Sequence, residues 1–136
     1  MFIASINLLA VGTSAIVSNA LGFLWFMVVF REPYLQGLGK TAEALAERPS
    51  TLVAATMQLI GSLVMAHVLA LLMERSSAQT VSGGLWWGLL AWLGFGAAVI
   101  GPLYAFQAFS PTFFLLTAGC PLVTLLVTGA ILGRRK

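Results

Sequence analysis

The sequence predicts an all-α integral membrane bundle of four transmembrane helices, with a short interfacial helix between the first two. Composition gives the first reason: 60% of the 136 residues are hydrophobic and only 8% are charged, against about 25% charged in a typical soluble domain. The second reason is four apolar segments of the roughly 20 residues that a bilayer crossing needs. Backbone groups find no hydrogen-bond partners in lipid, so these segments must be helices. Residues 1–136 form a single transmembrane domain.

The first predicted span covers about residues 3–30. Within it, the small residues "SNA" suit a signal-peptide cleavage site, but no positive region precedes the span and its apolar run continues to Phe30. We therefore interpret it as a retained span. The other three spans are predicted at about residues 52–73, 85–106 and 112–132.

The longest predicted connection, Arg31–Pro49, holds six of the eleven charged side chains. Pro33, Gly37 and Gly39 are expected to break any helix in its first half. From Thr41 onward, "TAEALAER" contains good helix formers behind a suitable N-cap, so it predicts a short helix at the membrane surface. We expect this segment to be a connection and a surface anchor rather than a site.

Four spans place both termini on one side of the membrane, together with the loop after the second span. The side with the termini has four basic residues, namely Arg75, Arg134, Arg135 and Lys136. The opposite side has three, namely Arg31, Lys40 and Arg48. The basic C-terminal cluster favours a multi-pass protein with both termini in the cytoplasm. A basic tail without a basic face does not indicate nucleic-acid binding.

Charged residues inside spans usually mark ion paths and proton relays, and none of the four predicted spans has one in its interior. A proton-coupled pump or exporter normally needs a buried carboxylate. The sequence also contains no Ser–His–acid set, no pair of carboxylates within a span and no phosphate-binding glycine loop. It therefore indicates no catalytic residues and no cofactor.

Neutral polar residues in the first span are the first candidate site. Asn7, Ser14, Ser18 and Trp25 project within a narrow arc if each residue turns 100°. One hypothesis is a polar lining of a binding site. The other is a close helix–helix contact, because Ser14, Ser18 and Gly22 repeat small residues every fourth position. We favour the second hypothesis.

His67 is the single histidine and the only side chain in a span that titrates near neutral pH. Thr56, Ile60 and Leu63 share its helical face. It is a candidate for a polar lining or a proton relay, although a neutral histidine bonded to a neighbouring helix is the commoner case. A second histidine, a cysteine or a glutamate at ligand spacing is missing from the sequence around it, so no metal site is predicted.

The third span opens with "GGLWWG". Trp86 and Trp87 stand at the depth where indoles suit the membrane interface. Gly84 and Gly88 are four residues apart and permit another helix to approach closely.

Prolines inside the last two predicted spans mark candidate helix breaks. Gly101–Pro102 lies in the third span and Gly119–Cys120–Pro121 in the fourth. Pro121 leaves the carbonyl of Thr117 without its usual donor, so a kink is expected there. Broken helices sometimes build transport sites from freed backbone groups, but a kink that shapes packing is commoner. Cys120 is expected to be a small buried hydrophobe.

Three stretches of the chain resemble a known family. "INLLAVGTSAIVSNALGFLWFMVVF" is similar to the opening span of the four-helix membrane proteins grouped as domain-of-unknown-function family 1761, with Asn7, Gly22, Trp25 and Phe26 at the matching positions. "GGLWWGLLAWLGFGAA" and "FFLLTAGCPLVTLLVTGAIL" resemble its third and last spans. The chain departs from the family at Cys120–Pro121, where a polar or histidine-containing pair is expected. The resemblance implies four spans and no soluble domain, and it supplies no activity.

Two classes of function stay open. The first is a non-enzymatic membrane protein: a pore, a small-solute permease or a membrane interaction subunit. The second is a small intramembrane enzyme or lipid-binding protein that acts on an apolar substrate. The sequence favours the first because it lacks catalytic groups. The expected partners are the lipid bilayer and further copies of the same chain, because four helices rich in small residues offer more close-packing faces than one bundle uses.

Overall fold

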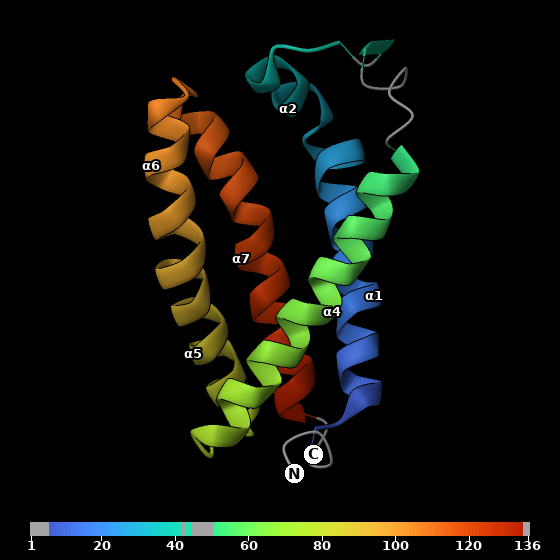
Figure 1. Cartoon of the computed structure of the whole chain (residues 1–136), viewed down its shortest axis with the longest axis vertical. Helices are drawn as coiled ribbons and strands as arrows, with labels where there is room; N and C mark the ends of the chain where they lie inside the picture. The colour runs from blue at the N-terminus through green and yellow to red at the C-terminus, as the bar shows by residue number, and fades with distance from the viewer. Residues whose placement is uncertain (1–5, 42, 45–50, 135–136) are drawn as a thin grey trace.

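The computed structural model describes residues 6–41, 43–44 and 51–134, and every regular element in these ranges is a helix. Four helical segments are long and apolar enough to cross a membrane: Leu8–Val29, Leu52–Arg75, Val81–Phe106 and Pro111–Arg134. They stand side by side in a bundle (Figure 1). The predicted fold class is confirmed.

The spans are built from α-helices and two π-helical segments. In chain order the helical elements are α1 (Leu8–Phe23), η1 (Leu24–Val29), α2 (Arg31–Leu38), α4 (Thr51–Arg75), α5 (Val81–Ala91), η2 (Trp92–Ala97), α6 (Ala98–Phe106) and α7 (Pro111–Arg134). The first span consists of α1 and η1, and the third of α5, η2 and α6, whereas α2 belongs to a connection. α1 begins and α7 ends at one end of the bundle, and α2 lies across the other end (Figure 1). We call the two halves of the bundle the terminal half and the α2 half.

Three helices begin behind polar residues that cap their first backbone N–H groups. Asn7 Oδ1 accepts a hydrogen bond from the N–H of Ala10 at 3.0 Å. Thr80 does the same for Gly83 at 3.0 Å, and therefore the third span begins four residues earlier than predicted. Ser110 caps α7 directly before Pro111, the expected first residue of that helix.

The connection after the first span differs from its prediction. Arg31–Leu38 forms helix α2, so the expectation that Pro33 and Gly37 exclude a helix there is wrong. Pro33 is the third residue of α2, where its missing N–H costs no intrahelical bond. Gly39 ends the helix with φ 72°, a left-handed conformation that suits glycine.

Part of the helix predicted from Thr41 falls outside the described residues, which omit 42 and 45–50. Within the described part, Thr41 Oγ1 accepts a hydrogen bond from the N–H of Ala44 at 3.1 Å, as a capping residue would.

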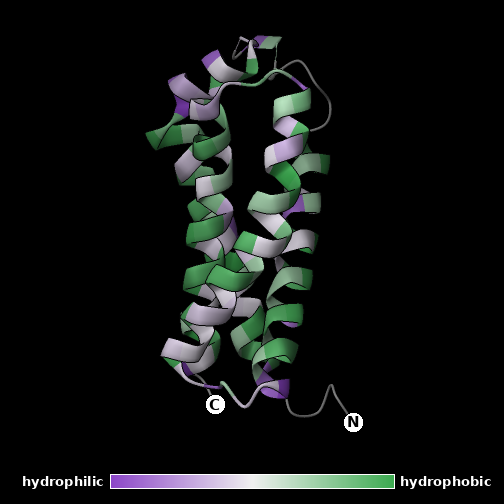
Figure 2. Cartoon of the chain, turned by 90° about the vertical axis from the view of Figure 1, so that its left-hand side faces the viewer, coloured by the Kyte–Doolittle hydropathy of each residue, from purple (hydrophilic) through white to green (hydrophobic). Residues whose placement is uncertain are grey.

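The outer surface of the bundle is apolar. Large hydrophobic side chains are exposed on all four spans, such as Ile16, Val64, Phe95 and Leu115. Hydrophobic residues predominate along the length of the helices (Figure 2). An apolar outer surface of this kind suits the hydrocarbon of a bilayer, in which exposed apolar side chains are solvated favourably.

The hydrophobic core lies in the terminal half. Its buried members are Ile6, Ala10, Val11, Ala66, Leu69, Met73, Leu125 and Leu132. They come from α1, α4 and α7, and from the residue before the Asn7 cap. Small residues dominate the points of closest approach, because dispersion contact between backbones replaces the hydrophobic effect as the source of helix association in lipid.

Glycines bring α5 and α7 into backbone contact. A Cβ atom added to Gly84 would collide with the backbone of Gly129, and one added to Gly129 would collide with the backbone of Gly84. One turn further along α5, a Cβ atom on Gly88 would lie 2.7 Å from the carbonyl oxygen of Leu125. The predicted close approach at Gly84 and Gly88 is therefore made to a helix of the same chain.

Candidate functional site

The polar face of α1 packs directly against α7. Ser14 and Ser18 are 0% and 2% exposed. The Oγ of Ser18 lies 3.3 Å from Oγ1 of Thr128, which is itself completely buried. These two hydroxyls join helices that lie 110 residues apart in the sequence. The small side chains allow the two helices to come close, and the hydroxyls satisfy each other.

Ser14, one turn below Ser18, has a buried Oγ without a hydrogen-bond partner in the described part of the chain. An unpaired hydroxyl in a buried position costs about 1–3 kcal/mol. The residue is tolerated here because its small volume fits the contact. Full burial of Ser14 and Thr128 also means that this face of α1 does not line a water-accessible path in the structure.

A second polar contact joins α1 to α4. The Nδ2 of Asn19 donates to the carbonyl of Ala15 at 2.8 Å and to the Oγ of Ser62 at 3.3 Å. Ser62 is 4% exposed. The amide therefore satisfies one backbone carbonyl of its own helix and one hydroxyl of its neighbour at mid-membrane depth.

Two tryptophans from different spans donate to the backbone of α7. Trp25 Nε1 lies 2.9 Å from the carbonyl oxygen of Leu116, and Trp92 Nε1 lies 2.8 Å from that of Ala118. Trp25 belongs to the π-helical segment η1, and Trp92 begins η2. The wider π turn changes the direction in which a side chain leaves its helix. In both spans this change coincides with an indole aimed at α7.

The region of α7 that receives the two indoles is the predicted break at Pro121. α7 continues through Pro121 as one helix from Pro111 to Arg134. The hydroxyl of Thr117 donates to the carbonyls of Phe113 and Phe114 at 2.8 and 3.2 Å, within its own helix. Gly119 lies under the ring of Trp25, where an added Cβ would be 3.1 Å from Cζ2. The absence of a side chain at Gly119 is what admits the indole.

The other predicted break does not join this region. Pro102 lies inside α6 and is exposed, so it faces the lipid side of the third span. The π-helical segment η2 precedes it by one turn. We interpret the irregular turn and the proline together as shaping the third span, since neither Pro102 nor Gly101 meets the polar residues of α1.

His67 lies apart from the polar residues of α1. It is half-buried on α4, and Thr56, Ile60 and Leu63, which share its helical face, are exposed. The buried face of α4 carries Ala66 and Leu69 instead. His67 makes no hydrogen bond with the described residues, so the structure does not unite it with Ser14 and Ser18 in one lining.

α2 is fixed to the end of the bundle by aromatic stacking. The ring of Phe113 stacks on Tyr34 of α2, with 6.0 Å between centroids, and on Tyr104 of α6, with 5.6 Å. Gly37 of α2 lies directly against the ring of Phe113. Burial raises the pKa of the Tyr34 phenol above its usual value, and the nearby phenol of Tyr104 raises it further.

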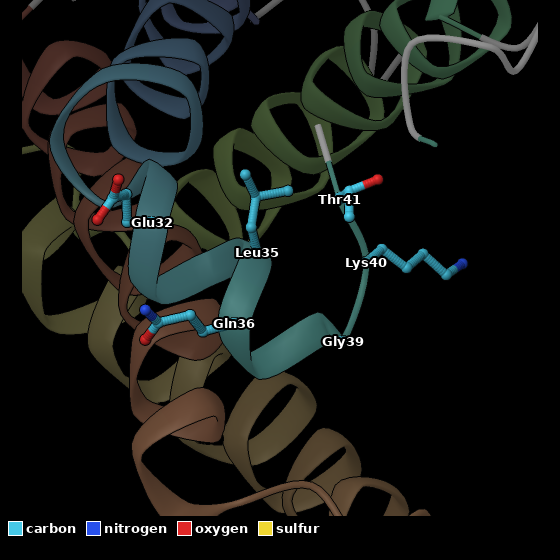
Figure 3. Close-up of a pocket in the computed structure, with 6 residues that line it drawn as sticks. All are labelled: Glu32, Leu35, Gln36, Gly39, Lys40 and Thr41. Atoms are coloured by element: carbon cyan, nitrogen blue, oxygen red, sulfur yellow. The ribbon is translucent and has the colours of Figure 1, made fainter. Parts of the chain in front are cut away.

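The polar side of α2 borders an open hollow of about 430 Å³. Its lining residues are Glu32, Leu35, Gln36, Gly39, Lys40 and Thr41. Figure 3 shows Glu32 and Gln36 on one side of α2 and Lys40 extending away beyond Gly39. The charged groups are exposed and do not converge. In the described ranges, no group of three His, Cys, Asp or Glu side chains gathers to hold a metal ion.

The comparison with protein families gives one match. The description "Protein of unknown function (DUF1761)" matches residues 9–133, nearly the whole chain. The chain belongs to the DUF1761 family. Searches of curated proteins and of solved structures found no match.

Membership in DUF1761 confirms the resemblance of the sequence to this family. The match includes three of the four residues quoted for the opening span, Gly22, Trp25 and Phe26, and it begins two residues after Asn7. It also includes the departure at Cys120–Pro121. The family description assigns no activity, so the function of this DUF1761 protein has to be argued from its own geometry.

Sequence reasoning missed two participants in the contacts of α7. Thr128 pairs with Ser18, and Trp92 makes the second indole bond. A usable signal existed for Trp92: it lies well inside a span, where an indole N–H needs an acceptor. For Thr128 the signal is its spacing: it follows Thr124 by four residues, as Ser18 follows Ser14.

Proposed function

We propose that this protein is a non-enzymatic membrane subunit that acts through helix–helix association within the bilayer. The observation that carries this proposal is the use made of its polar groups. Ser18 is bonded to Thr128, Asn19 to Ser62, and the two indoles are bonded to α7. Each of these groups holds helices together instead of lining a cavity.

Burial of the α1 face argues against a pore or permease. A conducting path needs polar groups that water or solute can reach, and Ser14, Ser18 and Thr128 are at most 2% exposed. His67 makes no hydrogen bond to any of them. The charged residues of the described chain stand at the span ends and in the α2 connection, where they anchor the bundle to the interface.

We further propose that the termini face the cytoplasm. Arg75 and Arg134 end α4 and α7 at the same end of the bundle. Basic residues next to span ends prefer the cytoplasmic side. The opposite end carries α2 with both Arg31 and Glu32.

A flux measurement in lipid vesicles tests the proposed function. Purified protein is reconstituted into vesicles loaded with a pH dye or placed in osmotic gradients of glycerol and urea. We expect proton and solute fluxes equal to those of protein-free vesicles. A saturable flux through the wild-type protein that Ser18→Leu abolishes would overturn the proposal in favour of transport. Equal amounts of inserted protein, measured after flotation, are the control.

A further inference from the structure

The two ends of the bundle carry different net charges. Along the sequence, the connection after the first span contains as many acidic as basic residues, namely Arg31, Lys40, Arg48, Glu32, Glu43 and Glu47. We call the opposite end, at which α1 begins and α7 ends, the terminal end. Its charged residues are Arg75, Arg134, Arg135, Lys136 and a single acidic residue, Glu74. The formal net charge of +3 therefore lies entirely at the terminal end.

Backbone dipoles do not offset this difference. α1 and α5 begin at the terminal end, and α4 and α7 end there (Figure 1). A helix carries a partial positive charge at its N-terminus and a partial negative charge at its C-terminus, so the two kinds of terminus compensate each other at each end of the bundle. The charged side chains therefore decide the sign of the electrostatic potential at the terminal end.

Packing between α4, α5 and α7 brings two arginines to the terminal end together. Met73 and Leu132 are buried in the same hydrophobic cluster, and they precede Arg75 and Arg134 by two residues each. Gly133 lies directly against the backbone that precedes α5, so α7 ends beside the connection that leads from Arg75 to α5. Both arginines are exposed.

Arginines in these positions reach the phosphate level of a bilayer. Arg75 and Arg134 are the last residues of two segments that are long and apolar enough to cross a membrane. From a span end, the long side chain extends its guanidinium into the headgroup region. A guanidinium pairs with phosphate oxygens in a bidentate manner. It carries five N–H donors, so it can hold a group of the protein and a phosphate oxygen at once.

We propose that the terminal end of the bundle binds the headgroups of anionic phospholipids, with Arg75 and Arg134 holding the phosphate groups. A zwitterionic phospholipid offers the same phosphate but adds a compensating ammonium, so the net positive charge of this end favours the anionic class. The inference goes beyond helix association, because it names a class of lipid as a partner. Anionic lipids give the cytoplasmic leaflet its negative surface potential, which agrees with the proposed orientation of the termini.

Quenching of tryptophan fluorescence by brominated lipids tests the inference. The protein is reconstituted into mixtures of brominated phosphatidylglycerol and phosphatidylcholine, and the quenching gives the relative binding constant of the two lipids at the protein surface. Trp86 and Trp87, in the first turns of α5, report from the terminal end. We expect the wild type to prefer phosphatidylglycerol. Arg134→Gln should lower this preference by up to about fivefold, the contribution of one basic residue near an anionic surface.

Lys40→Gln is the matched control. It removes the same charge from an exposed residue at the α2 end, so it should leave the lipid preference as it is. Arg75→Gln should lower the preference as Arg134→Gln does, and Arg134→Lys should retain most of it because the charge is kept. An equal loss in Lys40→Gln and Arg134→Gln would overturn the assignment of the terminal end, as would an unchanged preference in both arginine variants.

Salt separates recognition of the headgroup charge from packing against the acyl chains. The Debye length falls from about 10 Å at 0.1 M salt to about 3 Å at 1 M, so the preference of the wild type should decline over this range. A preference that salt leaves unchanged would contradict the inference, and so would a wild-type protein that does not distinguish the two lipids. None of these results affects the proposal that the protein does not transport solutes, which the flux measurement tests separately.

Discussion

The two halves of the bundle hold their helices together in different ways. In the terminal half, Gly84 and Gly129 bring two backbones into contact, and most of the core residues are small or aliphatic. In the α2 half the contacts are made by large aromatic side chains, such as Trp25 of η1 and Phe113 between two tyrosines. The helices of the terminal half are therefore held by close packing, and those of the α2 half by a few directed contacts.

This difference shows how one chain varies helix separation along a membrane bundle. Dispersion attraction needs contact over many atoms, so the terminal half depends on shape and tolerates no added volume. An indole N–H or a stacked ring reaches across a wider gap, so the α2 half can splay and leave part of α4 unpartnered. Substitutions should therefore act by steric overlap in one half and by loss of a single directed contact in the other.

Gly129→Ala should have the largest effect on stability. The added Cβ collides with the backbone of Gly84, so α5 and α7 must move apart. Overpacking of this kind costs roughly 1–3 kcal/mol in free energy of unfolding. Denaturation of the detergent-solubilised protein by SDS, followed by circular dichroism, measures the change.

Gly12→Ala is the control for that substitution. A Cβ at Gly12 meets no atom within 4 Å, and alanine favours a helix over glycine by up to about 1 kcal/mol. The control should unfold at the same or a higher SDS fraction than the wild type. Equal losses in both variants would show that the glycines matter for a reason other than backbone contact.

Trp92→Phe should have an intermediate effect, because it removes a directed contact near the middle of the third span. It removes the 2.8 Å bond to the carbonyl of Ala118 and keeps an aromatic ring, so we expect a loss of about 1 kcal/mol. Trp86→Phe is the control, because Trp86 is 59% exposed and its indole has no acceptor in the described chain. The same SDS titration compares them, and a Trp86→Phe loss as large as that of Trp92→Phe would contradict the assignment.

Ser18→Ala and Ser14→Ala should shift stability in opposite directions by smaller amounts. Ser18 loses its contact with Thr128, worth about 0.6 kcal/mol in membrane bundles. Ser14 has a buried Oγ without a partner among the described residues, so replacing it with alanine should leave stability unchanged or raise it. A double substitution of Ser18 and Thr128 measures their coupling. A coupling energy of zero would show that the contact between Ser18 and Thr128 does not stabilise the α1–α7 interface.

Alkaline pH should produce the smallest effect, confined to the docking of α2. The pKa of Tyr34 is raised in the folded protein, so its contribution is complete below the unfolded value near 10 and declines as pH rises through the folded pKa. Stability should therefore fall more between pH 9 and pH 11 in the wild type than in Tyr34→Phe. Cysteine labelling of a Leu38→Cys variant reports whether α2 leaves the bundle, and identical pH profiles would contradict the prediction.

The sequence by itself determined that the protein lies in a lipid bilayer, its fold class and the number of its spans. An apolar composition and four uncharged stretches leave helices as the only backbone solution in lipid, and the boundaries follow from capping residues such as Ser110 with Pro111. It also indicated that Ser14 and Ser18 mark a close helix contact. These features depend on composition and on local spacing, both of which can be read along the chain.

Only the tertiary structure decided which residues meet. Asn7 was grouped with Ser18 by helical spacing, but it lies at the helix start and caps Ala10. Helical spacing also could not show that Ser18 meets Thr128 or that Trp92 meets Ala118, because each pair joins distant parts of the chain. The position of α2 was decided in the same way: Pro33 and Gly37 discourage a helix locally, whereas stacking of Tyr34 and Gly37 on Phe113 stabilises one. Local preferences of this size are smaller than the packing energy that opposes them, so contacts between helices determined the outcome.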